Sequence, residues 1–318
     1  MAGAFIIGAL SVVQSRINGE LGQVLQDGIL AAFISFSVGL AITIVVIFAI
    51  PRQRATLKKL RAALQPGPDG KAELRRWQLL GGLGGATFVA AQGISVQYLG
   101  VAIFTVAVVA AQNANSLVVD RLGIGPSGVQ PISAQRVFAA VVATIGVAIA
   151  VTGRLDAATF SLAALILALV AGAAIAVQQA VIGRVALAAG SSWTAGFVNF
   201  IVGWIGLGLA LAVSHILTGR PLPTPPAPWS HPILWIGGFI GLAFILVTGS
   251  VIHTLGVLLF ALLTIAGQMT GALVVDLAWP QNPEPISWAL VIGVLVTGAA
   301  VALATASRSG DRKGIITM

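Results

Sequence analysis

Long apolar segments separated by short polar ones dominate the sequence. Runs of about twenty predominantly apolar residues recur along the chain, which is the length of helix that crosses a hydrocarbon core of about 30 Å. The runs are too long and too uniformly apolar for barrel strands, and lipid offers the backbone no hydrogen-bond partners. Each run is therefore predicted to be a transmembrane helix. The ten predicted spans are residues 3–24, 29–50, 77–97, 101–120, 134–153, 159–184, 192–217, 233–252, 256–276 and 286–306.

The composition supports an all-α integral membrane protein in a lipid bilayer. Of the 318 residues, 58% are hydrophobic and 8% are charged, and the mean hydropathy is +1.01. A soluble domain carries about three times that share of charged residues. The chain contains no cysteine, which excludes disulfides and thiolate metal sites.

The basic residues are distributed unevenly over the predicted loops. Eight of the seventeen Lys and Arg residues lie in the loop between the second and third spans. If the N-terminus is cytoplasmic, the inner loops and the C-terminal tail hold fourteen of the seventeen, the outer loops hold two, and Arg16 lies within the first span. This bias predicts that both termini are cytoplasmic. We therefore attribute the net charge of +8 to topology and predict no nucleic-acid partner.

Two segments of the first half match two segments of the second half without gaps. Residues 8–39 align with 172–203 at ten of 32 positions, and residues 81–120 align with 237–276 at fifteen of 40. The matches pair Gln14 with Gln178 and Gln112 with Gln268, which shared apolar composition does not explain. We predict two five-span repeats, 1–154 and 155–318. An odd number of spans inverts the second copy in the membrane, an arrangement found in alternating-access transporters.

Several motifs in these segments resemble one family. A Gln and an Asn in the first span, "AAFISFSVG" at 31–39, "LGGLGG" at 80–85 and "AQNANSLVVD" at 111–120 look like the YdcZ-like branch of the drug/metabolite transporter superfamily. Each half resembles one family domain, so the resemblance covers nearly the whole chain. It implies a ten-helix carrier of the bacterial inner membrane, often labelled an exporter, whose substrates are mostly unassigned.

The resulting prediction is a secondary transporter that exports a small polar metabolite or drug by alternating access. A passive channel or facilitator for a small neutral solute is the alternative, and saturable flux with counterflow would favour the carrier. The chain lacks the HExxH and GxSxG motifs and a close pair of carboxylates within the spans. We therefore predict that it is not an enzyme, and that it has no catalytic residue, cofactor or metal site.

Amides within the predicted spans are the first candidates for a substrate path. Gln112 and Gln268 lie near the middle of spans four and nine, and Gln14 and Gln178 lie on spans one and six. Together they would supply donors and acceptors from four helices to a polar ligand. The alternative is that they hydrogen-bond one another and hold the bundle together, as buried amides do at about 0.6 kcal/mol each.

Three further residues are predicted to line the path. Asn18 follows Gln14 by four residues and Asn115 follows Gln112 by three, so each shares a helical face with its glutamine. Trp204 lies in the middle of a span, where core packing is the alternative. Ile182 stands at the repeat position of Asn18, which departs from the family pattern.

Charged and titratable residues within the spans are candidates for coupling. Arg16 and Glu20 stand four residues apart and can pair along one helix. Alternatively, Arg16 attracts an anionic group or Glu20 titrates during transport. His253 ends the eighth span with a pKa range suited to a proton switch, although a histidine at a helix end is more often an interfacial hydrogen-bonder. The sequence does not decide whether transport is coupled to protons or ions, or whether the protein is a monomer or a homodimer.

Overall fold

In the part of the chain that the computed structural model describes, every regular element is a helix. The described residues are 2–67, 70, 72–126, 128–129, 134–152, 160–279, 288–289, 291–296 and 298–299, without the side chains of 135, 136, 139, 143, 147, 150, 151, 251–262 and 276. The helices are α1 (Ala2–Leu25), α2 (Gly28–Ala49), α3 (Pro51–Ala63), α4 (Gly82–Arg121), α5 (Ala134–Thr152), α6 (Leu162–Ala189), α7 (Ser192–Thr218) and α8 (Gly237–Ala278). Two short 3₁₀ helices, η1 (Arg76–Gly81) and η2 (Pro232–Trp235), precede α4 and α8.

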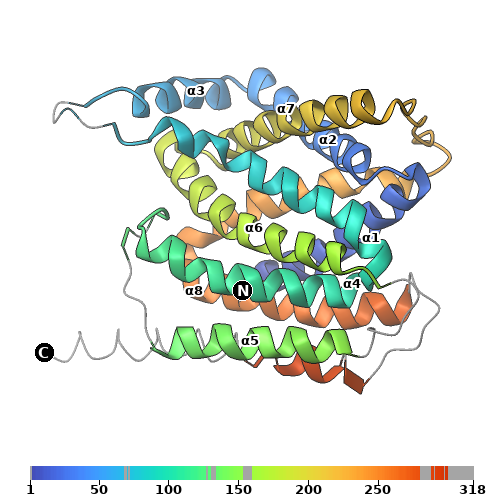
Figure 1. Cartoon of the computed structure of the whole chain (residues 1–318). Helices are drawn as coiled ribbons and strands as arrows, with labels where there is room; N and C mark the ends of the chain where they lie inside the picture. The colour runs from blue at the N-terminus through green and yellow to red at the C-terminus, as the bar shows by residue number, and fades with distance from the viewer. Residues whose placement is uncertain are drawn as a thin grey trace, which may run out of the picture.

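The helical membrane character predicted from the apolar runs is confirmed. Among the described residues, five segments are long and apolar enough to cross a membrane: Gly28–Ala49, Arg76–Arg121, Leu162–Ala189, Ser192–Thr218 and Pro232–Ser250. The helices α1 and α5 coincide with the first and fifth predicted spans. The tenth predicted span lies largely outside the described residues. Figure 1 shows the long helices side by side, with α3 and α7 along one edge of the bundle and α5 along the other.

Two of the helices are each long enough for two crossings. The 40 residues of α4 correspond to roughly 60 Å at about 1.5 Å per residue, twice the thickness of a hydrocarbon core. Gly100 interrupts α4 with φ 74° and ψ 164°, a conformation that glycine adopts most readily. Figure 1 shows the two arms of α4 running in opposite directions. The interruption at Gly100 lies between the third and fourth predicted spans. The 42 residues of α8 likewise cover most of the eighth and all of the ninth predicted span.

Short capped turns join α1 to α2 and α6 to α7. The carboxylate of Asp27 accepts hydrogen bonds from the backbone N–H groups of Ile29 and Leu30, at 2.9 Å each. Ser191 accepts from the N–H of Thr194 at 3.3 Å in the same position before α7. Asp27 and Ser191 are related by the first repeat shift of 164 residues. Side-chain caps of this kind satisfy the free N–H groups of the first helical turn.

The two halves of the chain interleave. α1 packs mainly along α8, whereas α6 packs mainly along α4. A Cβ atom at Gly8 would overlap the carbonyl oxygen of Thr264, and one at Gly172 would overlap that of Val108. The two crossings join equivalent positions of the aligned segments. Glycine allows these helices to approach backbone to backbone, which is a common way to pack helices in membranes.

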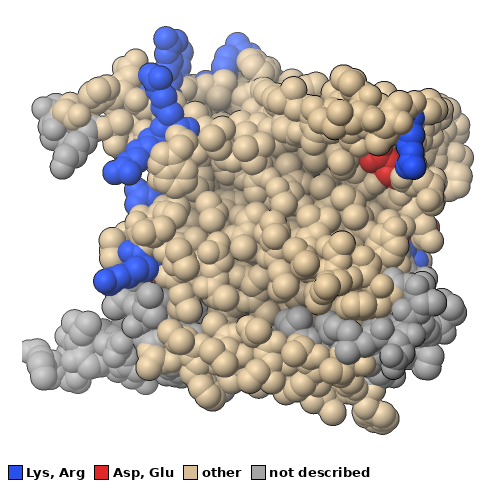
Figure 2. Space-filling model, in the orientation of Figure 1, with Lys and Arg blue, Asp and Glu red and all other residues tan. Residues whose placement is uncertain are grey.

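Charged side chains lie mainly at the ends of the helices. In Figure 2 most of the visible Lys and Arg side chains lie at one end of the bundle, on α3 and below it, while the opposite end carries a small acidic cluster with a basic side chain beside it. Between the two ends, the described part of the visible face carries almost no charge. An uncharged band between charged ends is what a membrane-crossing bundle requires.

Candidate functional site

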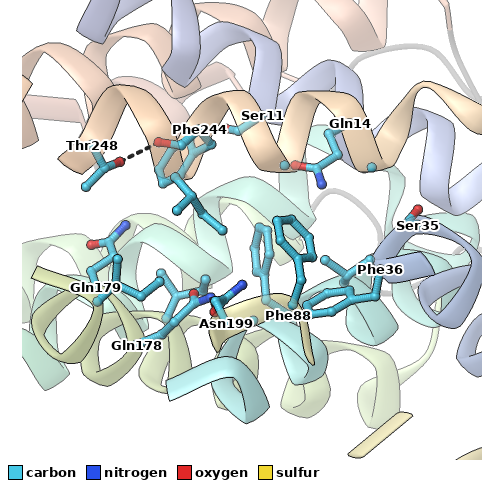
Figure 3. Close-up of a pocket in the computed structure, with 18 of the residues that line it drawn as sticks. Ser11, Gln14, Ser35, Phe36, Phe88, Gln178, Gln179, Asn199, Phe244 and Thr248 are labelled. Carbon is cyan, nitrogen blue, oxygen red and sulfur yellow. Dashed lines mark hydrogen bonds between the residues drawn. The ribbon is translucent and has the colours of Figure 1, made fainter. Parts of the chain in front are cut away.

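A cavity lies between the two halves of the molecule. Its empty volume is about 790 Å³ with open solvent space included. Residues of α1, α2, α4, α6, α7 and α8 form its wall, and Figure 3 shows most of them as sticks. The polar side chains of the wall are Ser11, Gln14, Ser35, Gln112, Gln178, Gln179, Asn199, Thr248 and Gln268.

All four glutamines predicted for the substrate path line this cavity. Gln14 lies on α1, Gln112 on the second arm of α4, Gln178 on α6 and Gln268 on the C-terminal part of α8. The structure therefore brings together side chains that are up to 254 positions apart in the sequence (14 to 268). Figure 3 places Gln14 on one side of the cavity and Gln178 with Gln179 on the other.

Three of these four glutamines donate hydrogen bonds to other neighbouring side chains and not to one another. Gln178 Nε2 donates to Asn199 Oδ1 at 2.7 Å, and Gln112 Nε2 donates to Gln179 Oε1 at 3.0 Å. Gln268 Nε2 donates to Ser11 Oγ at 3.4 Å. Within the described structure, the buried carbonyl oxygens of Gln112 and Gln268 accept no hydrogen bond. A buried acceptor without a partner costs about 1–3 kcal/mol.

Equivalent positions of the two aligned segments build most of the wall. The shift of 164 residues relates the positions in α1 and α2 to those in α6 and α7, and the shift of 156 relates α4 to α8. Both members of eight such pairs line the cavity: Ser11 with Ile175, Gln14 with Gln178, Ser35 with Asn199, Phe36 with Phe200, Gly85 with Gly241, Phe88 with Phe244, Val89 with Ile245, and Gln112 with Gln268.

The wall is mostly apolar and carries uncharged polar side chains. Among the described residues that line the cavity, there is no Asp, Glu, Lys, Arg or His. The apolar part includes four phenylalanines in two equivalent pairs, and the rings of Phe36 and Phe200 meet edge to face with centroids 5.2 Å apart. The cavity can therefore offer amide and hydroxyl groups and aromatic surface to a ligand, but no counter-charge.

Asn18 lies in a buried chain of hydrogen bonds. Its side chain, in a residue that is 0% exposed, donates to Gln92 Oε1 at 2.7 Å and accepts from Ser35 Oγ at 2.6 Å. Gln92 Nε2 in turn donates to Ser15 Oγ at 2.8 Å. The amide of Asn18 is thus satisfied by α2 and α4, and Asn18 is not among the residues that line the cavity. Four residues separate it from Gln14, about 6 Å along the helix, and the cavity ends between the two.

Asn115 and Trp204 also make protein contacts outside the cavity wall. Asn115 Nδ2 donates to the carbonyl oxygen of Ala173 at 2.7 Å and so ties α4 to α6. Trp204 is 37% exposed, donates from Nε1 to Ser37 Oγ at 2.9 Å and packs against the ring of Phe33. The expected path residues therefore separate into four glutamines in the wall and three side chains that join helices.

The coupling candidates Arg16 and Glu20 form the expected pair along α1, with Arg16 Nη1 3.3 Å from Glu20 Oε2. Arg16 Nε also donates to the carbonyl oxygen of Trp279 at 2.9 Å, and its guanidinium lies 4.7 Å from the centre of the Trp279 ring. The arginine thus holds the C-terminal end of α8 against α1, where a cation also complements the helix dipole. The side chain of His253 lies outside the described residues.

A second arginine has the corresponding role in the other half. Arg184 on α6 donates to the carbonyl oxygens of Gly123, Ile124 and Gly125 at 2.8–3.1 Å, just beyond the end of α4. Gly123 is the repeat equivalent of Trp279, whose carbonyl Arg16 binds. Sequence comparison does not reveal this similarity, because Arg16 aligns with an alanine and Arg184 with Glu20.

Sequence reasoning also missed a contact between Asp27 and His215. His215 Nε2 lies 2.9 Å from Asp27 Oδ2 and joins the end of α7 to the cap of α2. The two residues are 188 positions apart, and neither belongs to a motif that would have connected them.

The comparisons with known proteins identify the class of protein. The family model described as "Putative inner membrane exporter, YdcZ" matches residues 1–149 and 163–303. The chain therefore belongs to the YdcZ family, a family of transporters, and it is a multi-pass inner membrane protein. The two matched regions agree with two successive family domains, as in the YdcZ-like branch of the drug/metabolite transporter superfamily.

A solved structure supports the fold. A chain titled only "Crystal structure of protein" is similar over 96% of this chain and 97% of its own length, with 19% sequence identity and a TM-score of 0.56. At that identity the similarity concerns the fold alone. No curated protein matches the chain.

Proposed function

We propose that the protein is a secondary transporter that exports a small polar metabolite or drug across the inner membrane by alternating access. The cavity between the two halves would be its substrate site, with Gln14, Gln112, Gln178 and Gln268 among the residues that bind the substrate. The observation that carries the proposal is that eight pairs of equivalent positions, one member from each half, line the cavity. A site shared by two related halves can open to either side when one half rocks against the other.

The proposed topology has ten spans in two inverted repeats, with both termini in the cytoplasm. The lengths of α4 and α8 support two crossings each, and the basic loop that contains α3 supports a cytoplasmic position for that end of the bundle. On this topology, the turn between α1 and α2 faces the outside and the turn between α6 and α7 faces the cytoplasm.

The proposal takes the structure as the state that is closed toward the outside. On this topology Ser15, Asn18, Ser35 and Gln92 lie outward of the cavity centre, and their hydrogen bonds join α1, α2 and α4 over the cavity. The four equivalent positions lie toward the cytoplasm, and all of them line the cavity: Gln179, Ile182, Asn199 and Thr248. Substrate would enter from the cytoplasm in this state, as export requires.

Cysteine labelling tests the proposal without knowledge of the substrate. Because the chain has no native cysteine, the single variants Val89→Cys and Ile245→Cys each carry one thiol in the cavity wall. The probe is a membrane-impermeant maleimide applied to right-side-out and to inverted vesicles. Lys58→Cys on α3 and Trp229→Cys in the loop before η2 are matched controls for the cytoplasmic and the outer face.

We expect both cavity cysteines to be labelled from either side and each control from one side only. An additional Asn18→Ile substitution should raise labelling from the outside and lower it from the cytoplasm. A reciprocal change of this kind distinguishes a carrier from a passive channel, in which access from both sides would change in the same direction. Labelling from one side only, with or without Asn18→Ile, would overturn the carrier.

A further inference from the structure

The residues of the cavity wall indicate the chemical class of the substrate. We propose that the substrate is a neutral molecule with a flat apolar body and at least two N–H or O–H donors, such as a primary carboxamide on an aromatic ring. This inference rests on the proposed function, because it takes the cavity as the substrate site. Three features of the described wall carry it: the absence of charged side chains, two buried acceptors without a partner, and the phenylalanines.

The absence of charge favours a neutral substrate. The arginines of the neighbouring helices are engaged elsewhere: Arg16 with Trp279 and Glu20, and Arg184 with the three backbone carbonyls that follow α4. A charged ligand would lose hydration in the cavity without gaining an opposite charge from the described wall, a loss of several kcal/mol for an ion. A neutral ligand avoids this loss.

Two buried acceptors of the wall lack a hydrogen-bond partner among the described residues. Gln268 is 8% exposed, and its carbonyl oxygen and that of Gln112 are buried without a described partner, while their Nε2 groups donate to Ser11 and Gln179. The two glutamines occupy equivalent positions of α4 and α8. Once the two amides turn toward the cavity, a ligand with two donors would supply the missing bonds, one to each half of the protein, which a ligand without donors could not do.

The phenylalanines favour a flat apolar body. Phe36 and Phe88 come from the first half, and Phe200 and Phe244 from the second, so aromatic surface is available from both halves. Figure 3 shows Phe36 and Phe88 close together in the cavity and Phe244 beside Thr248. Aromatic rings pack well edge to face or in offset stacks, so a ring or a similar planar group can lie among them while its donors reach the amides.

Four probes of nearly the same shape test this class. Benzamide is neutral and has two donors, benzoate is the anion, benzamidinium is the cation, and N,N-dimethylbenzamide keeps the ring and carbonyl without a donor. Binding of radiolabelled benzamide to the full chain in nanodiscs is measured by equilibrium dialysis, with the other three as competitors. We expect benzamide to bind at least tenfold more tightly than either ion and at least fivefold more tightly than the dimethyl compound.

Two variants connect the binding to the cavity. Gln268→Glu places a carboxylate in the wall and should reverse the order, so that benzamidinium binds at least tenfold more tightly than benzamide. Gln97→Glu is the matched control, because Gln97 also lies on a long helix but outside the cavity wall, with its side chain bonded to the carbonyl of Ile94. It should leave the order of the wild type unchanged.

The binding experiment and the cysteine labelling test different parts of the proposal. If benzoate or benzamidinium binds to the wild type as well as benzamide, or if none of the four probes binds, the proposed substrate class is overturned. The cysteine labelling needs no ligand, so reciprocal labelling together with a failure here would remove the substrate class and leave the carrier. Labelling from one side only would remove the carrier itself.

Discussion

Four positions of the first half and their four equivalents in the second half make different contacts in the structure, although Ser35 also lines the cavity. Ser15, Asn18, Ser35 and Gln92 form one continuous buried chain of hydrogen bonds, which we call the closed quartet. The equivalent residues, which we call the open quartet, all line the cavity: Gln179, Ile182, Asn199 and Thr248. Related backbone segments thus join helices at one end of the bundle and contribute side chains to the cavity wall at the other.

The difference has a chemical cause as well as a geometrical one. Asn18 is the centre of the closed quartet, since it both donates to Gln92 and accepts from Ser35. In the open quartet Ile182 occupies that position, and an isoleucine side chain can do neither. Asn199 accepts from Gln178 instead. The open quartet could not form the same chain of bonds even if its side chains rearranged. In the absence of substrate, the proposed carrier should therefore favour the state in which the bonds of the closed quartet are formed.

The substitution Asn18→Ile should give the largest effect, because it makes the closed quartet resemble the open one. It would leave Gln92 Oε1 and Ser35 Oγ buried with a partner removed, at about 1–3 kcal/mol for each group. We expect the balance between the two states to shift at least tenfold toward the state open to the outside. The measurement is the ratio of outside to cytoplasmic labelling of Ile245→Cys.

Stability distinguishes this shift from simple damage. Circular dichroism and the temperature of aggregation in detergent should show a folded protein, and Asn18→Asp, which keeps the acceptor oxygens, should have a smaller effect on labelling. A loss of folded protein without any change in the labelling ratio would mean that the closed quartet is structural only.

The exchange at the equivalent position, Ile182→Asn, should shift the balance in the same direction as Asn18→Ile, with a smaller magnitude. It introduces an amide among Gln179, Asn199 and Thr248, where one or two new hydrogen bonds could form on closure at about 0.5–1.5 kcal/mol each. We expect the outside-open state to become roughly threefold to tenfold more populated, because its closure on the cytoplasmic side gains bonds. The same cysteine ratio measures it, and Ile182→Val, which adds no polar group, should leave the ratio unchanged.

The arginines offer a comparison of the two halves with an intermediate effect on stability. Arg16→Met should destabilise the protein by about 1–3 kcal/mol, because the Trp279 carbonyl and the partly exposed Glu20 lose a charged partner. Arg184→Met should have a similar effect through the three carbonyls that follow α4. Adding Glu20→Gln to Arg16→Met should recover part of the loss, whereas adding it to Arg184→Met should not. Thermal aggregation in detergent measures all four variants, and equal responses to Glu20→Gln would contradict the two roles.

Much of the fold could be predicted from the sequence because the requirements of a bilayer are simple. Apolar length defines a helix that crosses the membrane, and the gap between the predicted spans 77–97 and 101–120 contains Gly100, where α4 changes direction. The four glutamines of the cavity could be found for a related reason. They are identical at equivalent positions, so two alignments isolate Gln14 with Gln178 and Gln112 with Gln268.

The remaining features depend on helix depth and on partners that differ between the halves. Asn18 does share a helical face with Gln14, but it lies one turn further along, where α2 and α4 cover α1. Gln92 aligns with Thr248 and Ser15 with Gln179, so the alignments give no signal for a network. Helical periodicity predicts the direction of a side chain, whereas the position at which a cavity ends depends on how several helices cross.

Substitution of Trp204 should have the smallest effect, and comparison with a substitution in the cavity wall tests where the substrate site ends. Trp204→Phe keeps the packing against Phe33 and removes one hydrogen bond to Ser37, so we expect less than about 1.5 kcal/mol in stability and no change in benzamide binding. Phe200→Leu on the same helix removes an aromatic ring from the cavity wall and should weaken benzamide binding about threefold to tenfold. Equilibrium dialysis compares the two. If Trp204→Phe weakened binding as much as Phe200→Leu, the substrate would lie on the outer surface of α7, and the cavity between the halves would not be its site.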